Sequence, residues 1–157
     1  SANTYDAVMA IESACYSPDK AAFLAEMFRV LKPGGRLSVL DAFRTKRSIS
    51  ESDEKLMTSW MSGWGATDID TIEEFTHKAQ DVGFAPTKFE DLQKHFNPSH
   101  YRCYRSARYL TPVLSLLTRV GLVSPVIYGY SRAARDAFLA VEKQLCVQGI
   151  FSATKPV

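Results

Sequence analysis

The chain has few of the residues from which disulfide frameworks and metal sites are built. Its three cysteines, Cys15, Cys103 and Cys146, are an odd number without a CxxC pair, which argues against a disulfide framework and against a zinc site. The three histidines show no ligand spacing with cysteines or carboxylates. We therefore predict free thiols in a reducing compartment and no bound metal.

Long apolar runs and a strong charge of one sign are also missing. The apolar runs are broken by Pro, Gly or Arg well before the length that spans a membrane, and no charged-then-apolar leader begins the chain. The 19 basic and 17 acidic residues leave a formal net charge of +2, which gives no basic field of the kind typical of nucleic-acid binders. These features predict a cytoplasmic protein that does not bind nucleic acid.

A glycine-rich turn between a strand and a helix, the usual cradle for a nucleotide cofactor, is missing as well. Gly34-Gly35 ends a helix and precedes a strand, which is the reverse of the required order. Gly63-Trp64-Gly65 follows no convincing strand. The sequence therefore contains no cofactor fingerprint of this type.

The opening residues predict a strand, a helix and a second strand. Tyr5–Ile11 is a short apolar run typical of a strand that is buried on both faces. Ser17-Pro18-Asp19 supplies a helix start, with a capping hydroxyl and a proline suited to the first turn. Pro33-Gly34-Gly35 ends this helix before a second apolar run, Leu37–Leu40. This order predicts two parallel strands with a right-handed crossover, and thus an α/β fold.

The rest of the chain is predicted to be mainly helical. A polar loop leads to a helix from about Ser52 to Met61, with Trp64 in the loop after it. A second capped helix runs from Asp70 to Val82 and is stopped by Gly83.

Residues Phe84–Leu92 alternate loosely and predict a further strand. The stretch Asn97–Tyr130 has a helical pattern, with Pro112 near a helix start, and another amphipathic helix is expected over Ser131–Leu145. At 46% hydrophobic residues the chain is expected to bury one core as a single domain.

Three segments resemble class I S-adenosylmethionine-dependent methyltransferases. Arg29-Val-Leu-Lys-Pro-Gly-Gly-Arg36 looks like the signature before the fifth strand of that fold. Ala10-Ile-Glu-Ser-Ala-Cys-Tyr-Ser-Pro-Asp19 resembles the segment after the fourth strand in the sterol side-chain and tocopherol methyltransferase group, and Gly149–Pro156 is similar to its closing antiparallel strand. The resemblance implies the C-terminal half of a Rossmann-like methyltransferase sheet with a helical lid or insert, in which the first strands and the glycine-rich cofactor turn are absent.

The resemblance also implies that residues 1–157 form one partial methyltransferase domain with three parts. A strand-helix-strand core is expected at 4–43, a variable helical insert with a strand near 84–92 at 44–130, and a terminal helix with an antiparallel strand at 131–157.

Two functions are compatible with such a fragment. The first is part of an enzyme that transfers the methyl group of S-adenosylmethionine to a small or lipid-like acceptor. S-adenosylmethionine would then be the cofactor of the complete protein, and the isolated chain would bind none and be inactive. The alternative is a non-catalytic dimerisation or partner-binding module, because a sheet edge without its neighbour would pair with a second copy or with a missing N-terminal half.

The candidate site follows the first strand. Ligands of open parallel sheets bind outside the carboxyl ends of the strands, which here points to the loop at residues 11–16. Glu12 is the candidate catalytic residue, either as a carboxylate facing positive charge or as a base. The alternative is that Glu12 caps the next helix or pairs with a lysine. Its neighbours Ile11 and Ser13 are candidate cofactor contacts by the resemblance.

Four residues are candidate substrate contacts. Tyr16 offers a hydroxyl or a stacking face, or is an ordinary half-buried tyrosine, and Asp41 ends the second strand at the same rim, or caps a turn. Trp60 and Trp64, with nearby methionines, suit a lid over an apolar substrate, although Trp and Met at helical spacing are more often core. Cys15 is predicted to fill apolar space and not to act as a nucleophile.

Arginines and tyrosines are interleaved in one later segment. Arg102, Arg105 and Arg108 recur at three-residue spacing within Tyr101–Tyr109. Such a pattern grips phosphates or lies at an anionic membrane surface in some proteins. With only three arginines, a solvated helix face is the favoured interpretation.

Overall fold

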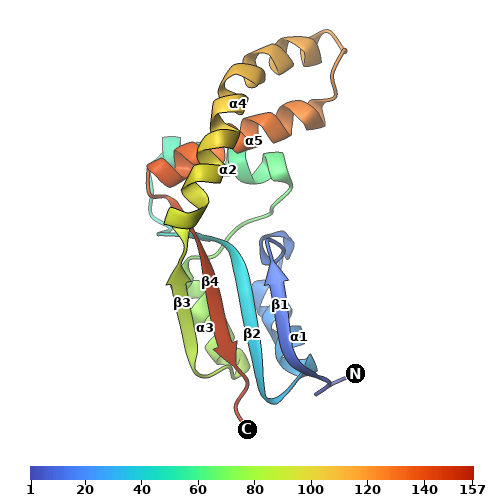
Figure 1. The fold of residues 1–157 in the computed structure, drawn as a ribbon, viewed down its shortest axis with the longest axis vertical. Helices are drawn as coiled ribbons and strands as arrows, with labels where there is room; N and C mark the ends of the chain where they lie inside the picture. Colours follow the sequence, from blue (N-terminus) through green and yellow to red (C-terminus); the bar gives the residue numbers. More distant parts are fainter.

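The computed structural model describes residues 1–157 as a mixed four-stranded sheet with a helical lobe at one end (Figure 1). The strands are β1 (Tyr5–Ile11), β2 (Leu31–Arg44), β3 (Thr87–Asp91) and β4 (Cys146–Thr154). The helices are η1 (Ala14–Tyr16), α1 (Lys20–Val30), α2 (Glu51–Trp64), α3 (Ile72–Val82), α4 (Gln93–Arg119) and α5 (Pro125–Glu142).

The sheet has the strand order β1-β2-β4-β3. β1 and β2 are parallel, with Val8 opposite Leu37, and α1 connects them. β4 is antiparallel to both β2 and β3, so that Leu37 also lies opposite Ala153. The predicted α/β class, the parallel pair and the closing antiparallel strand are therefore confirmed. The three-part division at residues 44 and 131 stays a prediction.

The helix after β1 begins as predicted, but with a different cap. The Asp19 carboxylate accepts a hydrogen bond from the Ala22 N–H at 2.9 Å and caps α1. The Ser17 hydroxyl instead donates to the Asp19 carbonyl at 2.8 Å, and Pro18 precedes the helix. Asp19 caps the helix in place of Ser17 because its negative charge also interacts favourably with the positive end of the helix dipole.

The expectation that β1 is buried on both faces is wrong. Only Ala10 is buried among its seven residues, and Met9 is 70% exposed. Helices α1 and α3 cover one face of the sheet, where side chains such as Leu24, Leu37 and Phe75 form the larger core (Figure 1). No helix covers the opposite face, so alternate side chains of β1 remain exposed.

The helical lobe has a separate core built from α2 and α5. Trp60 and Met61 of α2 pack there against Ala133 and Ala137 of α5. The two helices approach closely at Gly63, where a Cβ atom would lie 2.6 Å from the Gly129 carbonyl oxygen. No helix of the structure combines the length and hydropathy that crossing a membrane requires.

Three predicted boundaries in this lobe are wrong. Trp64 ends α2 and does not lie in the loop, because the left-handed Gly65 caps the helix one residue later. Pro112 lies inside α4, since packing against α5, including the 2.8 Å contact of Thr111 Oγ1 with Ser131 Oγ, outweighs the cost of a proline. Helix α5 begins at Pro125, six residues before the predicted start at 131.

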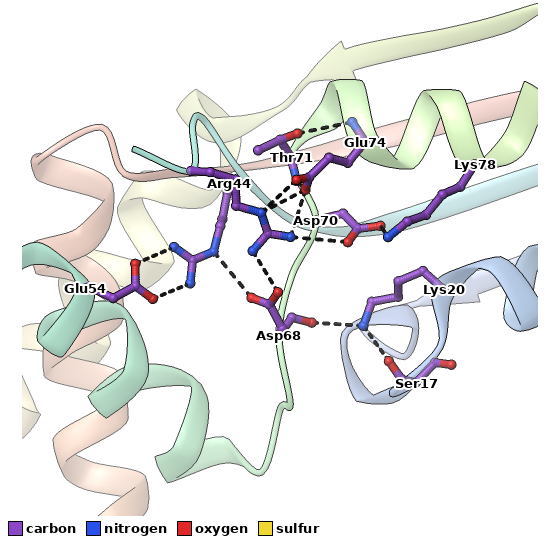
Figure 2. A network of polar contacts seen from close by, with 10 residues as sticks. Ser17, Lys20, Arg44, Glu54, Asp68, Asp70, Thr71, Glu74 and Lys78 are labelled. Atoms are coloured by element: carbon purple, nitrogen blue, oxygen red, sulfur yellow. Dashed lines mark hydrogen bonds and ion pairs between the residues drawn. The ribbon is translucent and has the colours of Figure 1, made fainter. Parts of the chain in front are cut away.

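A polar network joins the two lobes at the end of β2 (Figure 2). Arg44 is only 3% exposed and donates two hydrogen bonds to the Glu54 carboxylate of α2, at 3.0 and 2.8 Å. Its Nε also lies 3.4 Å from Asp68, and its backbone N–H donates to the Asp70 carbonyl at 2.9 Å. A single buried guanidinium thus connects β2, α2 and the loop that leads to α3.

Arg47 extends this network toward the sheet helices. It donates to Asp68 at 2.7 Å and to both carboxylate oxygens of Glu74 at 2.9 Å. The hydrogen bond with Arg47 lowers the pKa of Glu74 to about 2. Glu74 also forms a capping box with Thr71 at the start of α3, and Lys20 of α1 donates to the Asp68 carbonyl at 2.9 Å (Figure 2). The network therefore fixes four elements relative to one another.

Replacing Arg44 by alanine tests whether the network stabilises the fold. The change leaves Glu54 and Asp68 without their shared partner and opens space beside β2, so we expect the free energy of unfolding to fall by about 2 kcal/mol in urea titrations. The matched control is Arg29→Ala, which removes an equally short contact with Glu26 on the exposed surface of α1 and should leave the urea midpoint unchanged. Equal effects of the two substitutions would contradict the role assigned to Arg44.

Candidate active site

A small cavity of about 60 Å³ lies where β1 and β2 end beneath α2. Its walls come from the loop after β1, the end of β2, the end of α2 with the loop that follows it, and the start of β4. The lining includes Glu12, Tyr16, Asp41, Trp60, Trp64 and Gln148. Five of these six residues are the candidate catalytic and substrate residues predicted from the sequence, and the fold brings them together from three separate segments.

Glu12 turns the chain sharply at the end of β1. It has a φ of 45°, a left-handed conformation that costs a non-glycine residue about 1 kcal/mol or more, and its N–H donates to the Leu40 carbonyl at 2.8 Å. Its carboxylate accepts a hydrogen bond from Gln148 Nε2 at 3.2 Å across β2. Glu12 caps no helix, since Asp19 caps α1, and it forms no ion pair with a lysine.

Asp41 is buried and holds the short helix η1 in place. One carboxylate oxygen accepts from the Cys15 N–H at 3.1 Å and the other from the Ala42 N–H at 2.9 Å. Asp41 therefore fixes the turn that carries Cys15 and Tyr16, and it lines the cavity as well. Tyr16 lies half-exposed at the cavity rim, and partial burial raises the pKa of its hydroxyl.

Two tryptophans form the side of the cavity that belongs to α2. The rings of Trp60 and Trp64 meet edge to face with their centroids 6.2 Å apart. Trp60 is buried in the core of the helical lobe, whereas Trp64 packs against that core from outside. These rings give the cavity an apolar wall and are part of the core at the same time.

The two candidate cofactor contacts do not line this cavity. Ile11 is exposed on the open face of the sheet, opposite Leu40 of β2. Ser13 occupies the position before η1 and its side chain makes no capping hydrogen bond. Contact of either residue with a cofactor stays a prediction.

Sequence analysis missed Gln148 and His100. Both line a second cavity of about 20 Å³ that adjoins the tryptophans. Three buried polar atoms of that lining have no hydrogen-bond partner: Trp60 Nε1, His100 Nδ1 and Gln148 Oε1. The one signal in the sequence was the polar Gln148 within the apolar start of the closing strand, and nothing in the sequence brings His100 near it.

Thiol reactivity tests this placement of the cysteines. Burial, followed by the charge of Asp41, raises the pKa of Cys15 to about 12, and burial raises the pKa of Cys146 to about 12. Only Cys103 is exposed. We expect one fast thiol with a disulfide reagent at about pH 8 and two more only after unfolding, because the thiolate is the reacting form. Cys103→Ser should abolish the fast phase, and a fast phase that survives this change would show that the cavity is more open than described.

Comparison with known proteins gives matches to methyltransferases. The family described as Methyltransferase domain matches residues 1–39. Methyltransferase phqN of Penicillium fellutanum is 36% identical over 92 residues, which are 57% of this chain and 28% of that protein. Sterol 24-C-methyltransferase erg-4 of Neurospora crassa is 27% identical over 145 residues, 88% of this chain and 38% of the relative. Cycloartenol-C-24-methyltransferase 1 of Oryza sativa subsp. japonica is 33% identical over 92 residues, 57% of this chain and 27% of the relative. The chain thus spans less than half the length of these curated relatives.

Solved structures share the fold. One match is Haemonchus contortus phosphoethanolamine N-methyltransferase 2 in complex with phosphomonomethylethanolamine and S-adenosylhomocysteine. Its TM-score is 0.73 at 18% sequence identity, and the match covers 100% of this chain and 34% of the Haemonchus chain. The cyclase SpnF matches with a TM-score of 0.67 at 22% sequence identity, and this match covers 99% of this chain and 52% of the SpnF chain. The chain is thus similar in sequence to methyltransferases, sterol methyltransferases among them, and it shares its fold with solved methyltransferase structures.

Proposed function

We propose that this chain forms the acceptor side of an S-adenosylmethionine-dependent methyltransferase whose acceptor is a sterol or another lipid-like molecule. The observation that carries the proposal is the convergence of Glu12, Tyr16, Asp41, Trp60 and Trp64 on one cavity at the carboxyl ends of the parallel strands. Ligands of open parallel sheets bind at this edge. The relatives named above as sterol methyltransferases support the choice of a lipid-like acceptor.

The residues of the cavity divide into charged and apolar groups. The Glu12 carboxylate is placed to stabilise positive charge that develops on the acceptor, or to accept a proton from it. Its hydrogen bond with Gln148 holds the carboxylate toward the cavity. The rings of Trp60 and Trp64 exclude water from the same space, which strengthens the electrostatic effect of a single carboxylate.

The cavity is too small for a whole lipid. At about 60 Å³ it is several-fold smaller than sites for drug-sized ligands, which occupy roughly 300 Å³ or more. Only the reacting end of an acceptor fits inside, and the rest of the molecule lies beyond the rim near Tyr16. The adjoining space of about 20 Å³ holds one hydroxyl-sized group, for which Trp60 Nε1 and Gln148 Oε1 supply a donor and an acceptor.

The described residues do not form a cradle for the adenosyl part of the cofactor. None of the eight glycines follows the carboxyl end of β1 or β2. The chain leaves β1 through Glu12 and Ser13 into η1, where no glycine-rich turn lets the backbone approach a nucleotide. We therefore propose that the isolated chain binds S-adenosylmethionine weakly or not at all and is inactive alone.

A non-catalytic dimerisation or partner-binding module is the second candidate. It is favoured by the free edge of β1, which pairs only with β2, and by the exposed side chains of Tyr5, Met9 and Ile11 on that strand. A bare strand edge next to exposed apolar side chains is a template for pairing with another chain. In such a module the cavity would have no ligand.

Tryptophan fluorescence distinguishes the two functions, because Trp60 and Trp64 are the chain's two tryptophans and both line the cavity. We expect sterols to change the emission saturably, whereas S-adenosylhomocysteine leaves it unchanged up to roughly millimolar concentration, a range that corresponds to very weak binding. An ammonium analogue of the sterol should bind more tightly than the neutral sterol, because it places a positive charge near Glu12.

Glu12→Gln is the informative variant, since it keeps the shape of the side chain and removes its charge. It should weaken binding of the ammonium analogue by roughly tenfold and leave binding of the neutral sterol unchanged. Glu26→Gln, on the exposed surface of α1, is the control and should change neither. Emission that responds to no lipid favours the partner-binding module, and micromolar binding of S-adenosylhomocysteine would contradict the assignment of this chain to the acceptor side.

A further inference from the structure

Helices α4 and α5 form a hairpin that projects away from the sheet, with its tip at the opposite end of the molecule from both chain termini (Figure 1). The hairpin packs on α2 and β4 near its base, with Gly129 against Gly63, and the turn between α4 and α5 projects beyond these contacts (Figure 1). We define the hairpin tip as residues 109–130.

The hairpin tip carries many large apolar side chains that are more exposed than buried. They are between 52% and 74% exposed: Tyr109, Leu110, Val113, Leu116, Val120, Leu122, Val126, Ile127 and Tyr130. Soluble proteins rarely expose so many adjacent apolar side chains unless the patch binds something. The tip therefore has the character of a binding surface.

Most of the hairpin lacks acidic residues, which in α4 and α5 are limited to Asp136 and Glu142. Residues 93–135 contain no aspartate or glutamate and seven basic residues: Lys94, Arg102, Arg105, Arg108, Arg119, Arg132 and Arg135. Since the whole chain has 19 basic and 17 acidic residues, the remaining part has 12 basic and 17 acidic ones. The near-neutral net charge thus hides a basic hairpin on an acidic body.

Most of these arginines are free to bind an external anion. Arg135 alone pairs with a carboxylate, that of Asp136. Arg102 and Arg105 are exposed on α4 and line a shallow depression with Tyr109, and the one hydrogen bond of Arg102 is a 3.4 Å contact of its Nε with the Pro98 carbonyl. Arg108 lies 5.9 Å from the ring of Tyr109 and is otherwise without a polar partner. Exposed guanidinium groups of this kind form paired hydrogen bonds with phosphate.

We propose that the hairpin docks on an anionic lipid surface, with its apolar tip in the bilayer interface and the arginines of α4 at the headgroup phosphates. Both observations are needed for this choice of partner. A second copy of the chain would bring two basic hairpins together, which like-charge repulsion opposes. A nucleic acid would pair with the arginines but would leave the apolar side chains of the tip in water. A lipid surface satisfies both groups, and the proposal does not depend on methyl transfer.

Vesicle flotation of the 157-residue chain tests this proposal. We expect binding to phosphatidylcholine vesicles that contain about 30% phosphatidylserine, and at least roughly tenfold weaker binding to pure phosphatidylcholine. Binding should decrease as NaCl rises above about 0.1 M, because salt screens the arginines. Equal binding to both vesicle types, or to neither, would overturn the proposal.

Two variants separate the contributions of charge and apolar surface. Replacing Arg102, Arg105 and Arg108 together by glutamine should weaken binding to the anionic vesicles by roughly tenfold or more. Leu116→Ser combined with Leu122→Ser should weaken it as well, because less apolar surface enters the interface. All five side chains are exposed, so circular dichroism and the melting temperature should stay unchanged.

The control removes the same charge from exposed positions outside the hairpin, by replacing Arg36, Lys46 and Lys88 with glutamine, and should leave vesicle binding intact. An equal loss in this control would show that only net charge matters and would overturn the proposal. Self-association that Leu116→Ser and Leu122→Ser abolish would assign the tip to a second copy. Binding to a single-stranded oligonucleotide as strong as to vesicles, and unaffected by the two serine substitutions, would assign the hairpin to nucleic acid.

Discussion

The buried guanidinium of Arg44 is the interaction on which the arrangement of the two lobes depends. It is the last residue of β2, and its partners Glu54 and Asp68 come from α2 and from the loop before α3. Removing such a group from water is costly unless its donors are paired, so the side chain is stable only with both lobes in place. Arg47 and Glu74 repeat the arrangement nearer the surface (Figure 2). The sheet and the helical lobe have separate apolar cores, and this network supplies the polar contacts between them.

The candidate site is a consequence of that connection. Asp41 lies three residues before Arg44 on β2 and holds η1, while Trp60 and Trp64 follow Glu54 on α2. Once Arg44 fixes β2 against α2, the carboxyl end of β1 faces the tryptophans and the cavity forms between them. The chemistry of Glu12 therefore rests on a structural contact that has no part in the chemistry. The hairpin of α4 and α5 belongs to the same lobe. A lipid surface bound to the hairpin would therefore lie on the side of the cavity and not on the side of the sheet.

The sequence predicted local features well where one residue type dictates the geometry. The polar residues at Asp70 predicted the capped start of α3, and the apolar runs at Tyr5–Ile11 and Leu37–Leu40 predicted the parallel strands. Pro112 led to a wrong helix start, because only the packing of α4 on α5 shows why the helix continues through this proline. The roles of Gln148 and Arg44 were not predicted, because each depends on a contact with a partner elsewhere in the chain. These partners lie 136 and 10 residues away. The charge asymmetry is present in the sequence, but the total charge does not show it because the total averages a basic hairpin with an acidic body.

Acid titration of the tryptophan emission tests most directly whether the polar network holds the cavity together. Arg47 lowers the pKa of Glu74 from 4.5 to about 2, and Arg44 lowers the pKa of Glu54. A carboxylate whose pKa falls on folding stabilises the protein fully above its unfolded pKa, and this contribution is lost as pH falls toward the folded pKa. Trp60 and Trp64 should therefore become exposed between about pH 4.5 and 2, in the same transition in which helical signal is lost. Emission that stays unchanged throughout this range, or that changes near neutral pH, would contradict the account.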